Sequence, residues 1–165
     1  MFAVANVFAQ ENSVFPTNGY RGSAFVYMAV NGDDFDTYSL GTTHGYQLNT
    51  KWFIGGGMQY NRGSLFYRQQ DYIFESFTEY ADIRLDMIKK AISPYLNFKL
   101  GYTVGDIEGY YLAPEVGVRF RHFNLGVGFE CQNHEAVYGL STKNGNEDSD
   151  LFMIRLAYDF KGRKK

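Results

Sequence analysis

A period-two alternation of apolar and polar residues runs through this chain from Gly19 to Phe160. In the segment ISPYLNFKLGYTV, every second residue from Ile92 to Val104 is apolar, and most residues between them are polar or glycine. Because successive side chains of a β-strand point to opposite faces, this alternation predicts strands with one apolar face. Helical spacing competes nowhere convincingly. The predicted strands number eight and cover residues 19–30, 37–48, 52–60, a segment that ends with 81–87, 92–104, 112–121, 123–132 and 152–160.

Composition excludes several other classes of protein. The 14 Tyr, 15 Phe and single Trp, with a net charge of -2, are the opposite of a disordered composition. A lone cysteine, Cys131, excludes a disulfide framework, and a pI near 5.9 argues against a nucleic-acid partner. No run of about 18 apolar residues predicts a membrane-spanning helix. An all-β single domain remains.

Eight such strands close into a barrel in two familiar ways, which differ in the face that meets water. A soluble ligand carrier points its apolar face inward, whereas an outer-membrane barrel points it at lipid. Here the polar face combines charges of both signs with many glycines, as a narrow, filled, polar interior requires. These glycines are Gly41, Gly45, Gly55, Gly57, Gly101, Gly117, Gly126 and Gly128. We therefore predict an eight-stranded antiparallel up-and-down transmembrane β-barrel, with a soluble carrier as the disfavoured alternative.

The aromatic residues of the apolar face gather near the ends of the predicted strands. This distribution is typical of the two aromatic girdles of a membrane barrel, and strands of about ten residues are long enough to cross a bilayer when tilted. The predicted girdle near one rim comprises Tyr20, Tyr46, Trp52, Phe120, Phe123, Tyr158 and Phe160, and the girdle toward the other rim comprises Tyr38, Tyr60 and Tyr102.

Connection lengths predict the orientation. The longer connections are residues 62–75 and 134–150, and short ones occur near Asn49, Lys89 and His122. Outer-membrane barrels have short periplasmic turns and longer extracellular loops, so this pattern places both termini in the periplasm.

The inward-facing charges are balanced in sign, which predicts an ion-paired and closed lumen. A group at similar depth comprises Asp82, Arg84, Lys99, Glu115, Glu130 and Arg155, and a group nearer the periplasmic end comprises Arg21, Asp86, Arg119 and Asp159. An unpaired buried charge costs several kcal/mol, so balanced groups favour a network of ion pairs. A narrow pore is the alternative.

The two ends of the chain differ from the rest. Residues 1–9 read MFAVANVFA, which we interpret as the remnant of a secretory signal peptide that ends in small residues. We expect residues 10–18 to form a periplasmic lead-in, residues 19–160 the barrel, and residues 161–165 a basic tail.

Three segments, HGYQLNTKWFIGGGMQYN, ISPYLNFKLGYTVGD and GYYLAPEVGVRFRHFNLGVGFE, resemble the small outer-membrane β-barrel domain family, the porin-like and OmpA/OmpX-like proteins. The resemblance covers residues 19–160. It implies a location in the outer membrane of a Gram-negative-type bacterium, in contact with its lipid. It also implies insertion by the assembly machinery that reads an aromatic-ended last strand, which Leu156, Tyr158 and Phe160 fit; the tail KGRKK departs from the family pattern.

Candidate chemistry is sparse. Thr42 and His44 share the lipid-facing side of one predicted strand, as a hydroxyl–imidazole pair would in a lipid-modifying enzyme, yet no acid can be assigned to orient the imidazole. His134 with Glu135 and the acidic residues 144–150 lack the spacing of a metal site.

We therefore expect no enzyme, metal or cofactor. The leading hypothesis is a monomeric structural or adhesion-type barrel whose long loops bind an extracellular partner. A narrow pore and a lipid-modifying enzyme are the alternatives.

Overall fold

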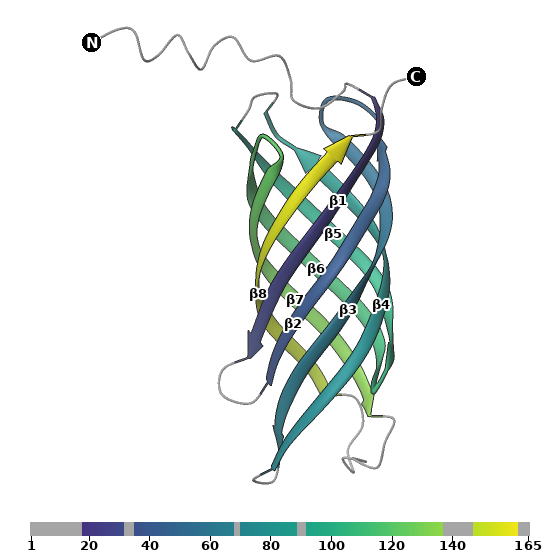
Figure 1. Cartoon of the computed structure of the whole chain (residues 1–165), viewed down its shortest axis with the longest axis vertical. Coiled ribbons are helices and arrows are strands. Elements are labelled where there is room, and N and C mark those ends of the chain that lie inside the picture. Colours follow the sequence, from purple (N-terminus) through teal and green to yellow (C-terminus); the bar gives the residue numbers. More distant parts are fainter. Residues whose placement is uncertain (1–17, 32–34, 68–69, 89–91, 137–146, 162–165) are drawn as a thin grey trace, which may run out of the picture.

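The computed structural model describes residues 18–31, 35–67, 70–88, 92–136 and 147–161. Each of its eight strands pairs antiparallel with the next, and β8 pairs with β1, which closes the barrel (Figure 1). The predicted fold class is thereby confirmed. The strands are β1 (Gly19–Asn31), β2 (Phe35–Gln47), β3 (Trp52–Tyr67), β4 (Gln70–Asp86), β5 (Ile92–Gly105), β6 (Ile107–Phe120), β7 (Phe123–Ala136) and β8 (Glu147–Lys161).

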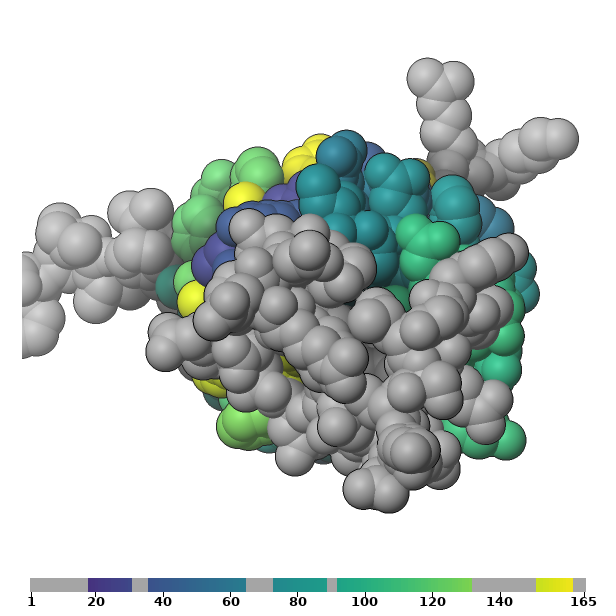
Figure 2. Space-filling view, turned by 90° about the horizontal axis from the view of Figure 1, so that it is seen from below, coloured from purple at the N-terminus to yellow at the C-terminus, as the bar shows by residue number. Residues whose placement is uncertain are grey.

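The strands are inclined to the barrel axis, as closure of an eight-stranded sheet requires (Figure 1). Seen along the axis from the end opposite the termini, the strand colours follow one another around the wall (Figure 2). We call this end the distal end, and the end at which β1 begins and β8 finishes the terminal end. No helix among the described residues is long and apolar enough to span a membrane.

The alternation in sequence becomes an alternation between lumen and outer surface. Along β5, Asn97 and Lys99 are buried in the lumen, while Leu96, Phe98 and Leu100 are 42%, 44% and 55% exposed on the outside. Charged groups thus lie inside and large apolar groups outside, which is the reverse of a soluble carrier. The outer surface is suited to lipid rather than to water.

Residues 62–67 and 70–75, predicted to belong to a long loop, instead form strand. The β3–β4 pairing continues to Tyr67 and Gln70, and this hairpin reaches further from the barrel than its neighbours (Figure 1). The alternation continues through the hairpin as well, because the ring of Phe74 is buried beside Gly63. The prediction was wrong because polar Arg62 and Ser64 resembled the start of a loop.

The connection between β5 and β6 is also tighter than the predicted strand bounds implied. Only Asp106 separates the two strands, and β6 begins at Ile107 rather than near residue 112. Short turns at residues 48–51 and 121–122 lie at the terminal end. β7 extends to Ala136, and residues 137–146 lie outside the described part of the chain. Loop length alone therefore does not distinguish the terminal end of the barrel from its distal end. The two ends differ in the extension of β3 and β4, which reach further at the distal end.

Candidate functional site

Glycines in the lumen lie opposite large aromatic rings. Phe25 faces Gly41 in the β1–β2 register, and a Cβ atom at Gly41 would lie 2.5 Å from Cζ of Phe25. Tyr80 faces Gly57 on β3 and Gly101 on β5, and a Cβ atom at Gly57 would lie 2.6 Å from the Tyr80 hydroxyl oxygen. Each ring occupies the volume that the opposite glycine leaves free.

The same arrangement recurs nearer the terminal end. A Cβ atom at Gly45 or Gly55 would lie 2.7 Å from Cζ of Phe53, and one at Gly117 would lie 2.5 Å from the hydroxyl of Tyr95. The inward glycines predicted from the sequence thus mainly make room for aromatic side chains rather than for the charged ones. Sequence reasoning placed these rings on the polar face but did not find that they pack against the glycines. Their signal is an aromatic residue on the polar face, opposite a glycine on the next strand.

Five charged residues form a buried cluster near the terminal end, which we call the terminal ion-pair cluster. Arg21 donates to Asp86 at 3.0 Å and to Asp159 at 2.5 Å. Arg119 donates to Asp86 at 2.6 Å, and Arg84 lies 3.4 Å from Asp159. All five side chains are almost fully buried, so the cluster fills the lumen at this level.

A second ion pair lies in the central part of the lumen. Nη1 of Arg155 is 3.2 Å from Oε1 of Glu115, and the hydroxyl of Tyr95 donates a short hydrogen bond to the same carboxylate. Arg84, expected in this layer, instead reaches Asp159 in the terminal ion-pair cluster. Its guanidinium extends well beyond its Cα, so strand position alone did not predict its partner.

Asp82 and Lys99 face each other in the β4–β5 register, and both are fully buried. Within the described residues, neither the ammonium of Lys99 nor the carboxylate of Asp82 has a hydrogen-bond partner. The ammonium instead lies 4.3 Å from the ring centre of Phe25 and 4.9 Å from that of Tyr80, which are cation–π distances. Glu130, the remaining predicted lumen residue, is fully buried.

Uncharged polar side chains fill the lumen nearer the distal end. Asn61 is their centre: its carbonyl oxygen accepts from Ser39 at 2.7 Å and from Gln59 at 3.0 Å. Its amide donates to Thr78 at 2.8 Å and to Ser76 at 3.2 Å. Sequence reasoning did not find this network, because neutral polar residues on a polar face carry no distinctive signal. Together with the charged groups, it occupies the lumen at successive levels.

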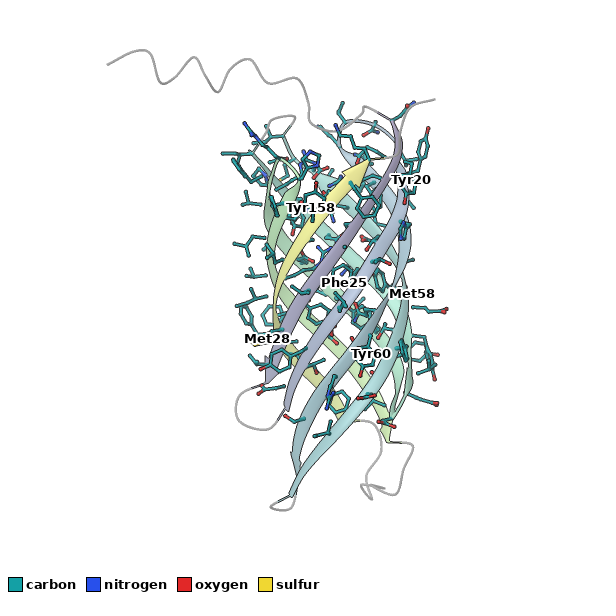
Figure 3. All side chains as sticks on the ribbon, viewed as in Figure 1. Tyr20, Phe25, Met28, Met58, Tyr60 and Tyr158 are labelled. Carbon is teal, nitrogen blue, oxygen red and sulfur yellow. The ribbon has the colours of Figure 1, made fainter. Side chains whose placement is uncertain are left out.

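The aromatic residues predicted to form two girdles all lie on the outer surface, with Tyr60 and Phe160 half-buried and the rest exposed. Tyr20 and Tyr158 lie toward the terminal end in Figure 3, and Tyr60 lies toward the distal end. Along β3, Trp52 and Tyr60 are eight residues apart. At about 3.3 Å per residue and a tilt near 40°, that separation spans roughly 20 Å, close to the apolar band of membrane barrels.

Further outward aromatics, missed in the sequence, extend the distal girdle. The rings of Tyr60 and Phe77 are 5.2 Å apart, and those of Tyr102 and Tyr110 are 5.7 Å apart. Both pairs join residues directly opposite each other on neighbouring strands.

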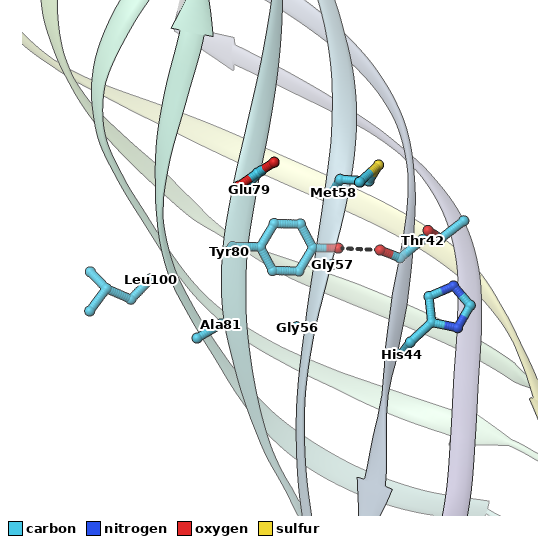
Figure 4. A pocket seen from close by; sticks show the side chains of 9 residues that line it. All are labelled: Thr42, His44, Gly56, Gly57, Met58, Glu79, Tyr80, Ala81 and Leu100. Atoms are coloured by element: carbon cyan, nitrogen blue, oxygen red, sulfur yellow. Dashed lines mark hydrogen bonds between the residues drawn. The ribbon is translucent and has the colours of Figure 1, made fainter.

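His44 lies on the outer wall in a shallow depression that also includes Thr42 and Glu79 (Figure 4). Nδ1 of His44 is hydrogen-bonded to the hydroxyl of Tyr20 at 2.6 Å, and its ring lies 5.9 Å from that of Phe160. Glu79 on β4, which sequence reasoning did not find, also lines this depression, but β3 lies between its strand and that of His44. The hydrogen bond of His44 nevertheless joins it to the aromatic girdle.

Among the residues that the structure describes, no group of three or more His, Cys, Asp or Glu side chains is arranged to hold a metal ion. The side chains of His134, Glu135 and residues 144–150, considered in the sequence, lie outside the described part.

No protein-family model matches the sequence, and no curated protein is significantly similar to it in sequence. Among solved structures, the barrel is similar to the outer membrane enzyme PagL, with a TM-score of 0.52, 14% identity, and coverage of 85% of this chain and 99% of PagL. Neisserial surface protein A matches with a TM-score of 0.48 and 16% identity over 88% of this chain and 98% of that one. The N-terminal barrel domain of Pseudomonas aeruginosa OprF matches with a TM-score of 0.42 and 14% identity over 87% and 98%. The likeness to PagL and the closed eight-stranded wall show that the chain has the fold of a small outer-membrane β-barrel.

Proposed function

We propose that this protein is an integral outer-membrane β-barrel with a closed lumen, and that it acts as a structural, adhesion-type or binding protein through its distal end. The observation that carries the proposal is the terminal ion-pair cluster. Arg21 of β1 bonds to Asp86 of β4 and to Asp159 of β8, and so joins three different strands inside the lumen. An eight-stranded barrel has little interior volume beyond its own side chains, so these groups leave no room for a wide pore.

The orientation that we propose places the termini in the periplasm of a Gram-negative-type bacterium and the distal end outside the cell. The extension of β3 and β4 beyond the distal girdle supports this choice, because outer-membrane barrels carry their larger projections on the extracellular side. The outward side chains of Leu156 and Tyr158 on the last strand fit insertion by the outer-membrane assembly machinery. We propose that the inserted barrel is a monomer surrounded by lipid.

A conductance measurement tests the closed lumen against the alternative of a narrow pore. The purified barrel, shown to be folded by its heat-dependent shift on unboiled gels, is added to a planar bilayer. We expect no large and stable conductance steps. Steps that recur with folded protein, and that disappear when the same sample is boiled, would establish the pore instead.

A lipid-modifying enzyme is the second candidate, favoured by the depression that contains Thr42, His44 and Glu79. We propose that this depression is not catalytic. A general base must reach the hydroxyl that it activates, and among the described residues the hydrogen bond of His44 goes to Tyr20 rather than to Thr42 or Glu79. Thr42, His44 and Glu79 are then polar positions of a lipid-covered wall.

A further inference from the structure

One edge of β4 carries no partner strand over its first residues. The β4–β5 pairing begins at Ser76 and Gly105, whereas β4 pairs with β3 as far as Gln70. Among the described residues, the strand that pairs with residues 70–75 is therefore β3 alone. We call the other side of this segment the free β4 edge.

Two hydrogen bonds show which backbone groups point toward the free β4 edge. The carbonyl of Glu75 accepts from the backbone N–H of Asp106 at 3.0 Å, and the N–H of Glu75 donates to the Asp106 carboxylate at 2.9 Å. Backbone groups alternate between the two edges of a strand, so the N–H and C=O of Ile73 and of Asp71 point the same way as those of Glu75. Asp106 therefore bonds to the outward backbone groups of Glu75. No described residue bonds to the outward backbone groups of Asp71 and Ile73.

The strand register agrees with this assignment. Arg62 and Glu75 are directly opposite in the β3–β4 register, and their charged groups lie 3.7 Å apart. Because the N–H and the C=O of Glu75 both bond to Asp106, this pair does not exchange backbone hydrogen bonds across β3 and β4. Ile73 lies opposite Ser64, two residues further along, and its backbone groups therefore also face away from β3.

The free β4 edge is accessible and acidic. Ile73 is 67% exposed, among the highest values for large apolar residues in this structure. It lies four residues beyond Phe77 of the distal girdle, roughly 10 Å past the apolar band at about 3.3 Å per residue along a tilted strand. Glu75, in an exposed ion pair with Arg62, and Asp106 flank the edge, so the net charge of these three side chains is negative. The sequence QDYIFE at residues 70–75 contains no lysine or proline, the residues that commonly protect an exposed edge.

We propose that the free β4 edge binds an extended, basic peptide segment of an extracellular partner by β-strand addition. The backbone groups of Asp71 and Ile73 would exchange hydrogen bonds with the added strand, and the flanking acids would select for positive charge. The proposal rests on the proposed function, since it requires the distal end to face the cell exterior.

The edge is tested by changing one backbone donor while the strand pairing is kept. Ile73→Pro removes an N–H that points away from β3, so the β3–β4 pairing persists, as proline is tolerated on strand edges with this orientation. Ile73→Thr is the matched control, because it shortens the apolar side chain but keeps the N–H and the β-branch. Both variants are checked for folding by the heat-dependent gel shift.

The probe is a fluorescent peptide of alternating lysine and valine, with an alternating glutamate and valine peptide as its charge control. We expect the basic peptide to bind the native barrel in detergent and to raise the hydrogen-exchange protection of the Asp71 and Ile73 amides. Ile73→Pro should weaken this binding roughly tenfold, about the effect of one lost hydrogen bond, and Ile73→Thr should weaken it less. Equal binding to native protein and Ile73→Pro, protection elsewhere, or no binding would overturn the proposal.

Two further outcomes are distinguishable. Self-association of the barrel that Ile73→Pro abolishes would identify a second copy as the occupant, and would overturn the peptide proposal. Protease or antibody access to a tag in the β3–β4 hairpin on intact cells tests the orientation separately. Binding in detergent without access on cells would refute the proposed orientation while the edge itself still binds strands.

Discussion

Two adjacent glycines on β3 allow the packing of the lumen to be tested with the same chemical change. Gly57→Ala places a methyl group in the lumen, where it overlaps the Thr42 carbonyl oxygen and lies 2.6 Å from the Tyr80 hydroxyl. Gly56→Ala places the methyl group in the depression of the outer wall, where the nearest atom is the Tyr80 carbonyl oxygen at 3.2 Å. Both changes restrict the unfolded chain equally, so their difference reports contacts in the folded state.

The expected magnitudes follow from these contacts. Overpacking typically costs about 1–3 kcal/mol, and Gly57→Ala should lie at the upper end because the Thr42 carbonyl belongs to the backbone and cannot rotate away. A loss of about 3 kcal/mol raises the unfolding equilibrium constant roughly 150-fold. Gly56→Ala should change the free energy of unfolding by less than about 1 kcal/mol.

The assay is urea unfolding of each barrel refolded into lipid vesicles, followed by tryptophan emission and by the heat-dependent gel shift. Reversibility is established for the native protein before the midpoints are compared. A loss for Gly57→Ala no greater than that for Gly56→Ala would refute the packing of Tyr80 against Gly57, and with it the role assigned to the lumen glycines.

Other substitutions test the remaining features. Asp159→Asn leaves two buried arginines without their shared carboxylate and should lower the free energy of unfolding by about 3–5 kcal/mol. Arg62→Gln, in an exposed ion pair, should lower it by less than about 1 kcal/mol. Equal losses would contradict the buried cluster. The emission of Trp52, the single tryptophan, should be quenched more by lipids brominated near the headgroup than at the chain end, and the reverse order would remove it from the girdle. His44→Ala should leave the lipid A profile of expressing cells unchanged, and a species that disappears with the variant would indicate catalysis.

The barrel could be predicted from the sequence because its signal is local. Alternation through Ile92 and Val104 defines two faces without reference to any other strand, and the charges assigned to the lumen are buried there. The same rule failed at residues 62–75, where polar residues of an exposed outer face resembled a loop. Once the strands pass beyond the lipid, the outer face need not be apolar, so Arg62 and Ser64 lie in strand.

The partners within the lumen could not be predicted in the same way, because register joins residues far apart in the chain. Arg21 and Asp159 meet only where β1 and β8 close the barrel, and Tyr80 meets Gly57 only through the β3–β4 register. Similarly, the strand position of Arg84 predicted that it would lie with the central charges of the lumen, whereas its long side chain reaches Asp159 in the terminal ion-pair cluster.

The strand order, the two faces and the polarity of each face follow from the sequence, since these features depend on a repeat of two residues along one chain. The fold is needed to see which charges pair, which rings lie over which glycines, and which edge of β4 stays unpaired. These features depend on contacts across strands, where the closure of the barrel and the reach of each side chain determine which atoms meet.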